Sequence, residues 1–266
     1  MEHPTGRGDG SMILVVTGTD TDVGKTVVTG ALAAGALAAH PRVAVYKPTQ
    51  TGVEHGQGGD VHSIGDWLGN PPGLTLEEGI RLADPMAPLD AALHAGGIAA
   101  ARALPTLADH VRRVRELALE HEVVIVEGAG GLLVSLTLAG ETIAEMASTL
   151  DARLVVVTRP DLGTLNHTAL TLEAAVARGL ADGVLLLGSF PAAPTALHER
   201  NRTNLRALAE SHGWTWVPGP PAAAVAAEDT ETTKRILSAA GRNMAPVFEA
   251  RQPALPQIAS GVCAAG

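Results

Sequence analysis

Residues 18–26 have the composition and spacing of a loop that binds a phosphate chain. Gly18 and Gly24 bound the loop, and Lys25 and Thr26 follow directly. Backbone N–H groups of such a loop point at the phosphates, and the helix start behind it adds about half a positive charge. Lys25 would reach the β- and γ-phosphates, and the Thr26 hydroxyl would bind Mg²⁺. The predicted nucleotide-binding residues are Thr19, Asp20, Thr21, Asp22, Val23, Gly24, Lys25, Thr26 and Val27.

The spacing of this loop departs from the usual one. Five residues separate Gly18 from Gly24, whereas the usual loop has four. A plain strand-to-helix turn, in which glycine supplies a positive φ, is the alternative. The position of the loop between the apolar run Met12–Val16 and the alanine-rich run Val27–Ala39 favours phosphate binding. The extra residue points to a subgroup of the phosphate-loop proteins.

Lys47 ends a second apolar run, Val43–Lys47. An unpaired lysine is costly to bury, so either its stem is buried and its ammonium reaches the surface, or it faces an anion. Its place at the carboxyl end of a predicted strand favours the anion, because ligands of open α/β sheets bind at that edge. Thr51 follows four residues later and could add a hydroxyl donor.

Two carboxylates are candidates for a metal site. Glu127 ends the run Val123–Glu127 and precedes small residues, which fits a ligand of Mg²⁺ in a nucleotide-hydrolysing enzyme; a solvated glutamate at a tight turn is the alternative. Asp60 lies in a glycine-rich segment, where a turn residue is the more common role.

A fourth strand end, after Leu154–Thr158, leads into a helix start that could hold a carboxylate on open N–H groups. Ordinary capping by Asp161 or Thr164 explains the same residues equally well. The residues of this helix start are Gly163, Thr164, Leu165 and Asn166.

Strands and helices alternate along the chain. Nearly continuous apolar runs are typical of parallel strands that are buried on both faces. Beyond the strands already named, they cover Gly183–Gly188 and Trp214–Val217. Helical segments are predicted at Val27–Ala39, Leu107–His121, Leu165–Arg178 and Glu199–His212. The alternation predicts an α/β fold with a doubly wound, mainly parallel sheet flanked by helices, of the P-loop NTPase type.

Composition limits the function classes. The 266 residues carry a net charge of −9, which argues against a general nucleic-acid surface. Cys263 is the single cysteine, so no disulfide forms within the chain, as expected in a reducing cytoplasm. No apolar stretch reaches about 18 residues, so we expect no membrane span.

One phosphate-loop domain is predicted over residues 12–243. Residues 1–11 form a flexible N-terminal extension, and residues 244–266 a tail that packs loosely. The segment Gly52–Gly97 is rich in glycine, proline and aspartate, and we interpret it as an active-site insertion with short helices.

Taken together, these motifs resemble the dethiobiotin synthase family over about Met12 to Leu205. The resemblance rests on five segments in this order: Gly18–Thr26, Tyr46–Gly52, Asp84–Pro88, Glu127–Gly131 and Leu162–His167. It implies ATP-dependent carboxylation and ring closure of 7,8-diaminopelargonic acid (7,8-diaminononanoate) with CO₂. The intermediates would be a carbamate and its mixed anhydride with phosphate, and the product would be dethiobiotin, in biotin biosynthesis.

The resemblance also assigns roles to residues. It implies that Lys25, Lys47 and Thr21 are catalytic, and that Thr26, Asp60 and Glu127 hold Mg²⁺. Thr51 and Lys47 match substrate positions. Residues 163–166 match a loop that holds the substrate carboxylate of the neighbouring subunit, which implies a homodimer with shared active sites.

The same residues also depart from the family pattern at one place and argue against three other functions. Leu187–Pro191 lacks the asparagine with which the family often recognises adenine, so base selectivity is open. A partition or assembly ATPase of the deviant phosphate-loop group is the main alternative, but it would carry a lysine where Asp20 stands. An amide ligase on a cobyrinic acid-type substrate would need a glutaminase domain with a nucleophilic cysteine, and the single cysteine, Cys263, lies near the end of the sequence. An inactive nucleotide-binding scaffold is a further alternative. The intact set of Lys25, Thr26, Lys47 and Glu127 argues against it.

Overall fold

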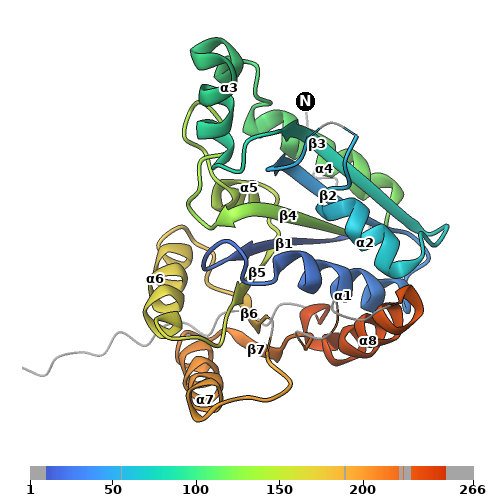
Figure 1. The fold of residues 1–266 in the computed structure, drawn as a ribbon, viewed down its shortest axis with the longest axis vertical. Helices are drawn as coiled ribbons and strands as arrows, with labels where there is room; N and C mark the ends of the chain where they lie inside the picture. Colours follow the sequence, from blue (N-terminus) through green and yellow to red (C-terminus); the bar gives the residue numbers. More distant parts are fainter. Residues whose placement is uncertain (1–9, 55, 189, 222–223, 225–228, 250–266) are drawn as a thin grey trace, which may run out of the picture.

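A computed structural model describes residues 10–249 except 55, 189, 222–223 and 225–228. Its centre is a seven-stranded sheet in the order β3-β2-β4-β1-β5-β6-β7, with every neighbouring pair parallel (Figure 1). The strands are β1 Met12–Gly18, β2 Val43–Thr51, β3 Leu74–Leu82, β4 Val123–Gly131, β5 Arg153–Thr158, β6 Gly183–Leu187 and β7 Thr215–Pro218. The predicted fold class is therefore confirmed.

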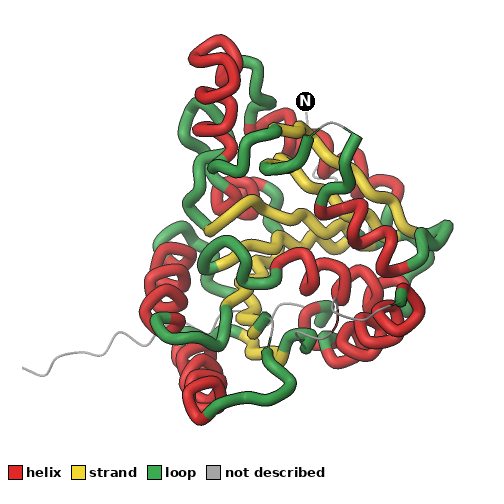
Figure 2. The backbone as a smooth tube through the Cα atoms, in the orientation of Figure 1, coloured by secondary structure: helices red, strands yellow, loops and turns green. Residues whose placement is uncertain are grey.

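Helices cover both faces of the sheet (Figure 2). One apolar cluster joins the sheet to α1 Lys25–Leu37, α2 Asp60–Leu68 and α8 Thr230–Asn243. The other joins it to α4 Leu107–Glu120, α5 Ile143–Thr149, α6 Thr164–Val176 and α7 Ala196–Ser211. The remaining helix, α3 Pro88–Arg102, packs against β3 at the sheet edge in a small cluster of its own. Since both faces are covered, the strands need no polar side, which explains their continuous apolar runs.

The segment Gly52–Gly97 differs from the prediction in one respect. It contains the expected helices α2 and most of α3, but it also contributes the edge strand β3, which pairs with β2 from Val43 to Thr51. The polar sequence of β3 hid this strand, because Glu77, Glu78 and Arg81 interrupt the apolar pattern. An edge strand tolerates such charges. Here Glu77 forms an ion pair with Arg113 of α4, and Glu78 forms one with Arg81 of β3 itself.

The C-terminal part of the described chain packs closely, contrary to the prediction of a loose tail. Met244 and Val247 are fully buried, and a short 3₁₀ turn, η2 Ala245–Val247, contacts β7. The buried guanidinium of Arg153 donates to the carbonyl oxygens of Pro246, Val247 and Glu249 at 2.9–3.0 Å. Residues 250–266 of the predicted tail, like most of the predicted extension at 1–11, lie outside the described residues.

A buried hydrogen bond joins β2 to α4 behind the strand that carries Lys47. The Tyr46 hydroxyl lies 2.7 Å from Nδ1 of His110, and both side chains are almost fully buried. Burial raises the pKa of Tyr46, so its hydroxyl stays protonated and donates. Burial lowers the pKa of His110 to about 4, so the imidazole is neutral and its Nδ1 accepts.

The neutral His110 predicts a pH-dependent stability. The unfolded chain takes up a proton at this histidine near pH 6.5, whereas the folded chain resists until about pH 4. Stability is therefore complete above pH 6.5 and falls as the pH drops towards 4. When the pH is lowered from 7.5 to 5, the free energy of unfolding of the native protein should fall by about 2 kcal/mol more than that of the His110→Asn variant. Urea unfolding at both pH values measures this, and equal losses would contradict it.

Within the described residues, no helix combines the length and the apolar character that crossing a membrane requires.

Candidate functional site

The phosphate loop joins β1 to α1 at the carboxyl edge of the sheet. Gly24 caps α1 in the left-handed region, with φ of 95°, where a side chain would be strained. The cap makes no side-chain hydrogen bond and no acidic residue occupies the first turn, so the positive end of α1 is left for an anion. This geometry favours the phosphate loop over the plain turn.

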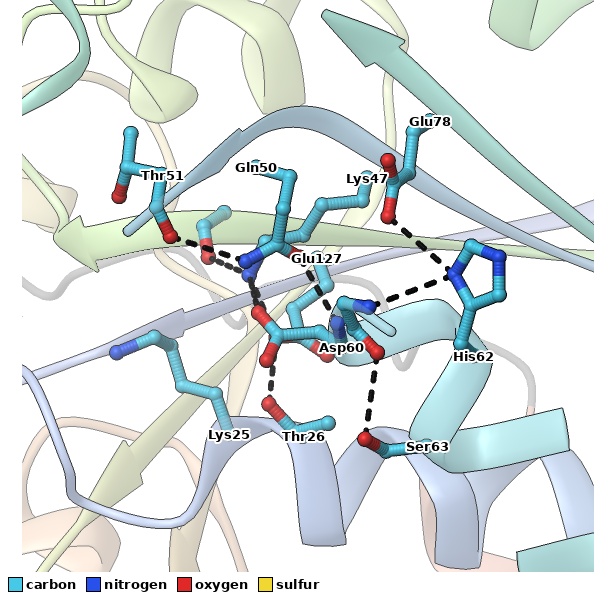
Figure 3. A network of polar contacts seen from close by, with 12 residues as sticks. Lys25, Thr26, Lys47, Gln50, Thr51, Asp60, His62, Ser63, Glu78 and Glu127 are labelled. Atoms are coloured by element: carbon cyan, nitrogen blue, oxygen red, sulfur yellow. Dashed lines mark hydrogen bonds and ion pairs between the residues drawn. The ribbon is translucent and has the colours of Figure 1, made fainter. Parts of the chain in front are cut away.

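Lys25 and Lys47 approach the same cavity from two elements. Lys25, on α1, donates to the carbonyl oxygen of Asp20 at 2.9 Å. Burial lowers its pKa, although Glu127 acts in the opposite direction. Lys47, on β2, is 4% exposed and lies 2.8 Å from Oε1 of Glu127 and 2.5 Å from Oδ2 of Asp60 (Figure 3). Lys47 therefore has two carboxylate partners, whereas among the described residues Lys25 forms no ion pair and donates to a carbonyl oxygen.

The two carboxylates keep Lys47 charged. Burial by itself would lower the pKa of Lys47, but Glu127 and Asp60 outweigh it and raise that pKa. The alternative of a lysine that snorkels to the surface is therefore wrong, since the ammonium is enclosed. The alternative of a solvated Glu127 is wrong as well, because that side chain is 1% exposed.

Thr26, Asp60 and Glu127 fit a hard divalent cation. The Thr26 hydroxyl donates to Oε1 of Glu127 at 2.9 Å, while Oε2 of Glu127 is buried with no hydrogen-bond partner in the described structure. Oxygen ligands suit Mg²⁺, which binds through one or two carboxylates together with substrate phosphates. Accordingly, the described residues hold no cluster of three His, Cys, Asp or Glu side chains able to bind a metal by themselves.

A cavity of about 470 Å³ connects these groups. Of the predicted nucleotide-binding residues, Thr21, Asp22, Gly24, Lys25, Thr26 and Val27 line it, with Lys47, Thr51, Asp60 and Glu127. The other three do not: Thr19 bonds through its N–H to Val157, Val23 is fully buried, and Asp20 accepts from its own loop at Thr21.

A second cavity of about 390 Å³ lies beside the first. The two share the lining residues Thr21, Asp22, Thr51, Ala129 and Gly130. The second cavity continues to Pro85–Pro88, the proline-rich segment before α3. It is less charged than the first, because Asp22 is its sole ionisable lining residue. The pair of cavities offers space for two ligands that meet at Thr21 and Thr51.

The helix start at residues 163–166 lines neither cavity. Gly163 caps α6 without a side-chain hydrogen bond, so capping by Asp161 or Thr164 is wrong. The Thr164 hydroxyl is buried 2.7 Å from that of Thr158, and the Thr164 N–H bonds to the carbonyl of Asp161. Thr164 is therefore unable to offer its hydroxyl to a ligand.

Sequence reasoning missed Gln50. Its side chain is 4% exposed and lines the first cavity. Its Oε1 accepts from the Asp60 N–H at 2.8 Å, and its Nε2 donates to the carbonyl of Thr51 at 3.1 Å. Gln50 thus connects the strand end to the start of α2 (Figure 3). The signal that could have found Gln50 is its position, because it is a polar residue that follows a predicted strand and precedes Thr51.

Comparison with known proteins adds independent information. The model of a family described as an AAA domain matches residues 13–213. The ATP-dependent dethiobiotin synthetase BioD of Rhodococcus erythropolis is 47% identical over 195 residues, which are 73% of this chain and 82% of that protein. The enzyme of the same name from Mycobacterium avium is 45% identical over 81% of this chain and 91% of that protein.

Solved structures support the fold alone. A MinC:MinD cell division protein complex from Aquifex aeolicus aligns with a TM-score of 0.52 at 11% sequence identity. The alignment covers 91% of this chain and 98% of that one. At this identity the likeness shows a common architecture and carries no functional argument.

Proposed function

The chain belongs to the family of ATP-dependent dethiobiotin synthetases, and from that premise we propose that it closes the ureido ring of dethiobiotin. The substrates are 7,8-diaminopelargonic acid, CO₂ and ATP. One observation of the site carries the proposal: two buried lysines and a buried glutamate face a cavity that opens onto a second, less charged one. The first suits a triphosphate, and the second suits a small diamine with an apolar chain.

The reaction brings two anions together. One amine of the substrate adds CO₂ to form a carbamate, and a carbamate oxygen then attacks the γ-phosphorus of ATP and displaces ADP. The second amine attacks the carbonyl carbon of the resulting mixed anhydride, closes the ring and releases phosphate. Both anions must lose water at the junction of the two cavities, so cations fixed there lower the barrier most.

Each site residue has a part in this reaction. Lys25 binds the transferred phosphoryl group from the loop side, and Lys47 binds the carbamate and the γ-phosphate from β2. Thr21 and Thr51 donate hydroxyl hydrogen bonds at the junction of the cavities, where the amines would lie. No protein nucleophile is required, because positioning and charge suffice for phosphoryl transfer.

Mg²⁺ is the metal we propose, held by Thr26, Asp60 and Glu127. When bound, it would supply positive charge to the β- and γ-phosphate oxygens. The residues present fit it: all three offer oxygen, and Oε2 of Glu127 has no other partner among the described residues. Lys47 would then give up part of its contact with these carboxylates for the phosphate and the carbamate.

The proposal also includes the domain organisation, the location in the cell and the subunit arrangement. One domain, which in the described structure continues past residue 243 to Val247, acts as a cytoplasmic homodimer. Residues 163–166 of each subunit bind the carboxylate tail of the substrate held by the other. The start of α6 has no side-chain cap, which leaves N–H groups there for a carboxylate and supports this arrangement. The partition ATPase alternative gains no support, because position 20 holds an aspartate where that class would carry a lysine.

A product assay tests the proposal. Phosphate release from ATP with Mg²⁺ should require both diaminopelargonic acid and bicarbonate, and mass spectrometry should detect dethiobiotin. Running the assay with ATP, GTP and CTP would also measure base selectivity, which the absence of asparagine at Leu187–Pro191 leaves open. Phosphate release that is indifferent to the diamine would overturn the assignment.

A further inference from the structure

Asp60 follows a glycine-rich segment whose described residues contain one internal backbone hydrogen bond, from the Gln57 N–H to the Glu54 carbonyl oxygen at 3.2 Å. The β2–α2 loop, residues 52–54 and 56–59 with 55 outside the described residues, connects the end of β2 to Asp60, the first residue of α2. Four of its residues are glycines. Glycine loses more conformational freedom on ordering than any other residue, so an ordered loop of this composition needs external contacts.

Arg81 supplies those contacts from the edge strand β3. Its Nη1 donates to two carbonyl oxygens of the β2–α2 loop, that of Glu54 at 3.1 Å and that of Gln57 at 2.5 Å. Its Nε and Nη2 form a two-pronged pair with the Glu78 carboxylate at 2.7–2.9 Å. The side chains of Arg81 and Glu78 are only 11% and 13% exposed, so this is not a solvated surface pair.

Glu78 and Gln50 fix the far end of the loop. A Cβ atom added at Gly59 would lie 2.6 Å from Oε1 of Glu78 and 2.8 Å from Oε1 of Gln50. The backbone at Gly59 is therefore pressed against both side chains, and the next N–H, that of Asp60, bonds to Gln50. Glycine is required here because of this close approach. Figure 3 shows Gln50 and Glu78 on either side of the start of α2.

We propose that Arg81, oriented by Glu78, is a positioning residue that holds the β2–α2 loop so that Asp60 faces Lys47 and the bound metal. The planar guanidinium serves both partners at once: one edge pairs with the carboxylate while Nη1 binds the two carbonyls. A lysine offers a single ammonium at that point and cannot satisfy both. The proposal rests on the proposed function for the role of Asp60 as a metal ligand.

The chain offers a control in a second arginine–glutamate pair, whose glutamate lies on the same strand, β3. Arg113 of α4 forms an equivalent pair with Glu77, with Nε and Nη2 each 2.7 Å from a carboxylate oxygen. Glu77 is the neighbour of Glu78, and successive residues of a strand point to opposite faces. Arg113 therefore anchors β3 from the face opposite the β2–α2 loop. Arg113→Lys weakens a pair of the same geometry, though a more exposed one, without touching the loop.

The experiment compares Arg81→Lys with Arg113→Lys in the full chain. Hydrogen exchange of the ligand-free protein should accelerate by about tenfold or more over residues 52–60 in Arg81→Lys, because hydrogen bonds to a charged group are lost. Isothermal titration of ADP over a range of Mg²⁺ concentrations should show the half-saturating Mg²⁺ rising about tenfold or more. ADP binding without Mg²⁺ should stay unchanged. Glu78→Gln, which preserves volume, should reproduce both effects in weaker form and replaces Arg81→Lys if that variant does not fold.

Exchange over residues 52–60 that matches native protein, or that rises equally in Arg113→Lys, would overturn the proposal. Faster exchange with an unchanged Mg²⁺ requirement would overturn it too, since the loop would then be ordered without serving Asp60. Neither measurement uses the diamine. A failed product assay with both effects present would therefore reject the reaction and leave the positioning role standing.

Discussion

Lys47→Ala should lower the rate of dethiobiotin formation by about a thousandfold or more. The Lys47 ammonium is enclosed at the junction of the β2 and β4 strand ends. In the proposed reaction, this is where charge develops on the transferred phosphoryl group. Removing one preorganised donor from such a site costs about 10²–10³ in turnover, and here a full charge is removed with it. Lys47→Arg tests whether charge alone suffices; we expect it to remain severely impaired, because the larger group does not fit between Glu127 and Asp60.

The fold of Lys47→Ala should survive with reduced stability. Glu127 and Asp60 lose their shared cation, so the melting temperature should fall in the absence of Mg²⁺ and recover in part when Mg²⁺ and ADP are added. Circular dichroism and single-turnover assays check both points. The chain has three lysines, and Lys234→Ala is the matched control, because Lys234 is exposed on α8. Turnover within tenfold of native protein would remove Lys47 from the catalytic machinery.

Glu127→Gln should lower turnover by about a hundredfold and change its pH dependence. The amide keeps the shape of the side chain but removes a buried negative charge that raises the pKa of Lys47 and that would serve the proposed metal. Without that charge, burial lowers the pKa of Lys47, so the ammonium loses its proton at a lower pH. The alkaline limb of the pH–rate profile should therefore move to lower pH than in native protein.

The control for Glu127→Gln is Glu116→Gln on the exposed side of α4. Glu116 pairs with Arg112 and Arg113 but has no contact with the site. Its variant should keep the native rate and the native profile. An unshifted alkaline limb in Glu127→Gln would show that the charge of Lys47 does not depend on Glu127. A near-native rate at low Mg²⁺ would show that Glu127 does not serve the metal.

The sequence predicted the strands that are buried on both faces and the chemistry at their ends. β1, β2, β4, β5 and β6 were each located within a few residues, because continuous runs of valine, leucine and isoleucine leave one interpretation. β3 was missed because its surroundings differ: an edge strand has charged partners on neighbouring elements, and no local pattern records them. α5 was missed because it is only seven residues long. α8 was missed because threonine, alanine and glycine make up most of its buried face.

The residues of the candidate site also divide into those that the local sequence indicates and those that depend on contacts distant in sequence. Lys25, Thr26, Lys47 and Glu127 could be found because a charged or hydroxyl group at the end of an apolar run is conspicuous. Asp60 could not be secured from spacing, since nothing in a glycine-rich segment indicates that it folds back to Lys47. The position of Asp60 beside Lys47 depends on Gln50 of β2 and Arg81 of β3, whose side chains form hydrogen bonds with backbone atoms of the β2–α2 loop and the start of α2. Such contacts become visible only when β2 and β3 are aligned.

The place of β4 in the sheet has a consequence for synthesis of the chain. β4 lies between β1 and β2, and Thr26 and Glu127 are 101 residues apart in sequence. A nascent chain that has emerged only as far as α4 has two strands with no partner between them, and their apolar edges are exposed. Productive collapse must therefore wait for residues 123–131, and slow passage through this stretch would favour aggregation or chaperone capture. The interleaved strands that assemble the site also set the earliest moment at which it can form.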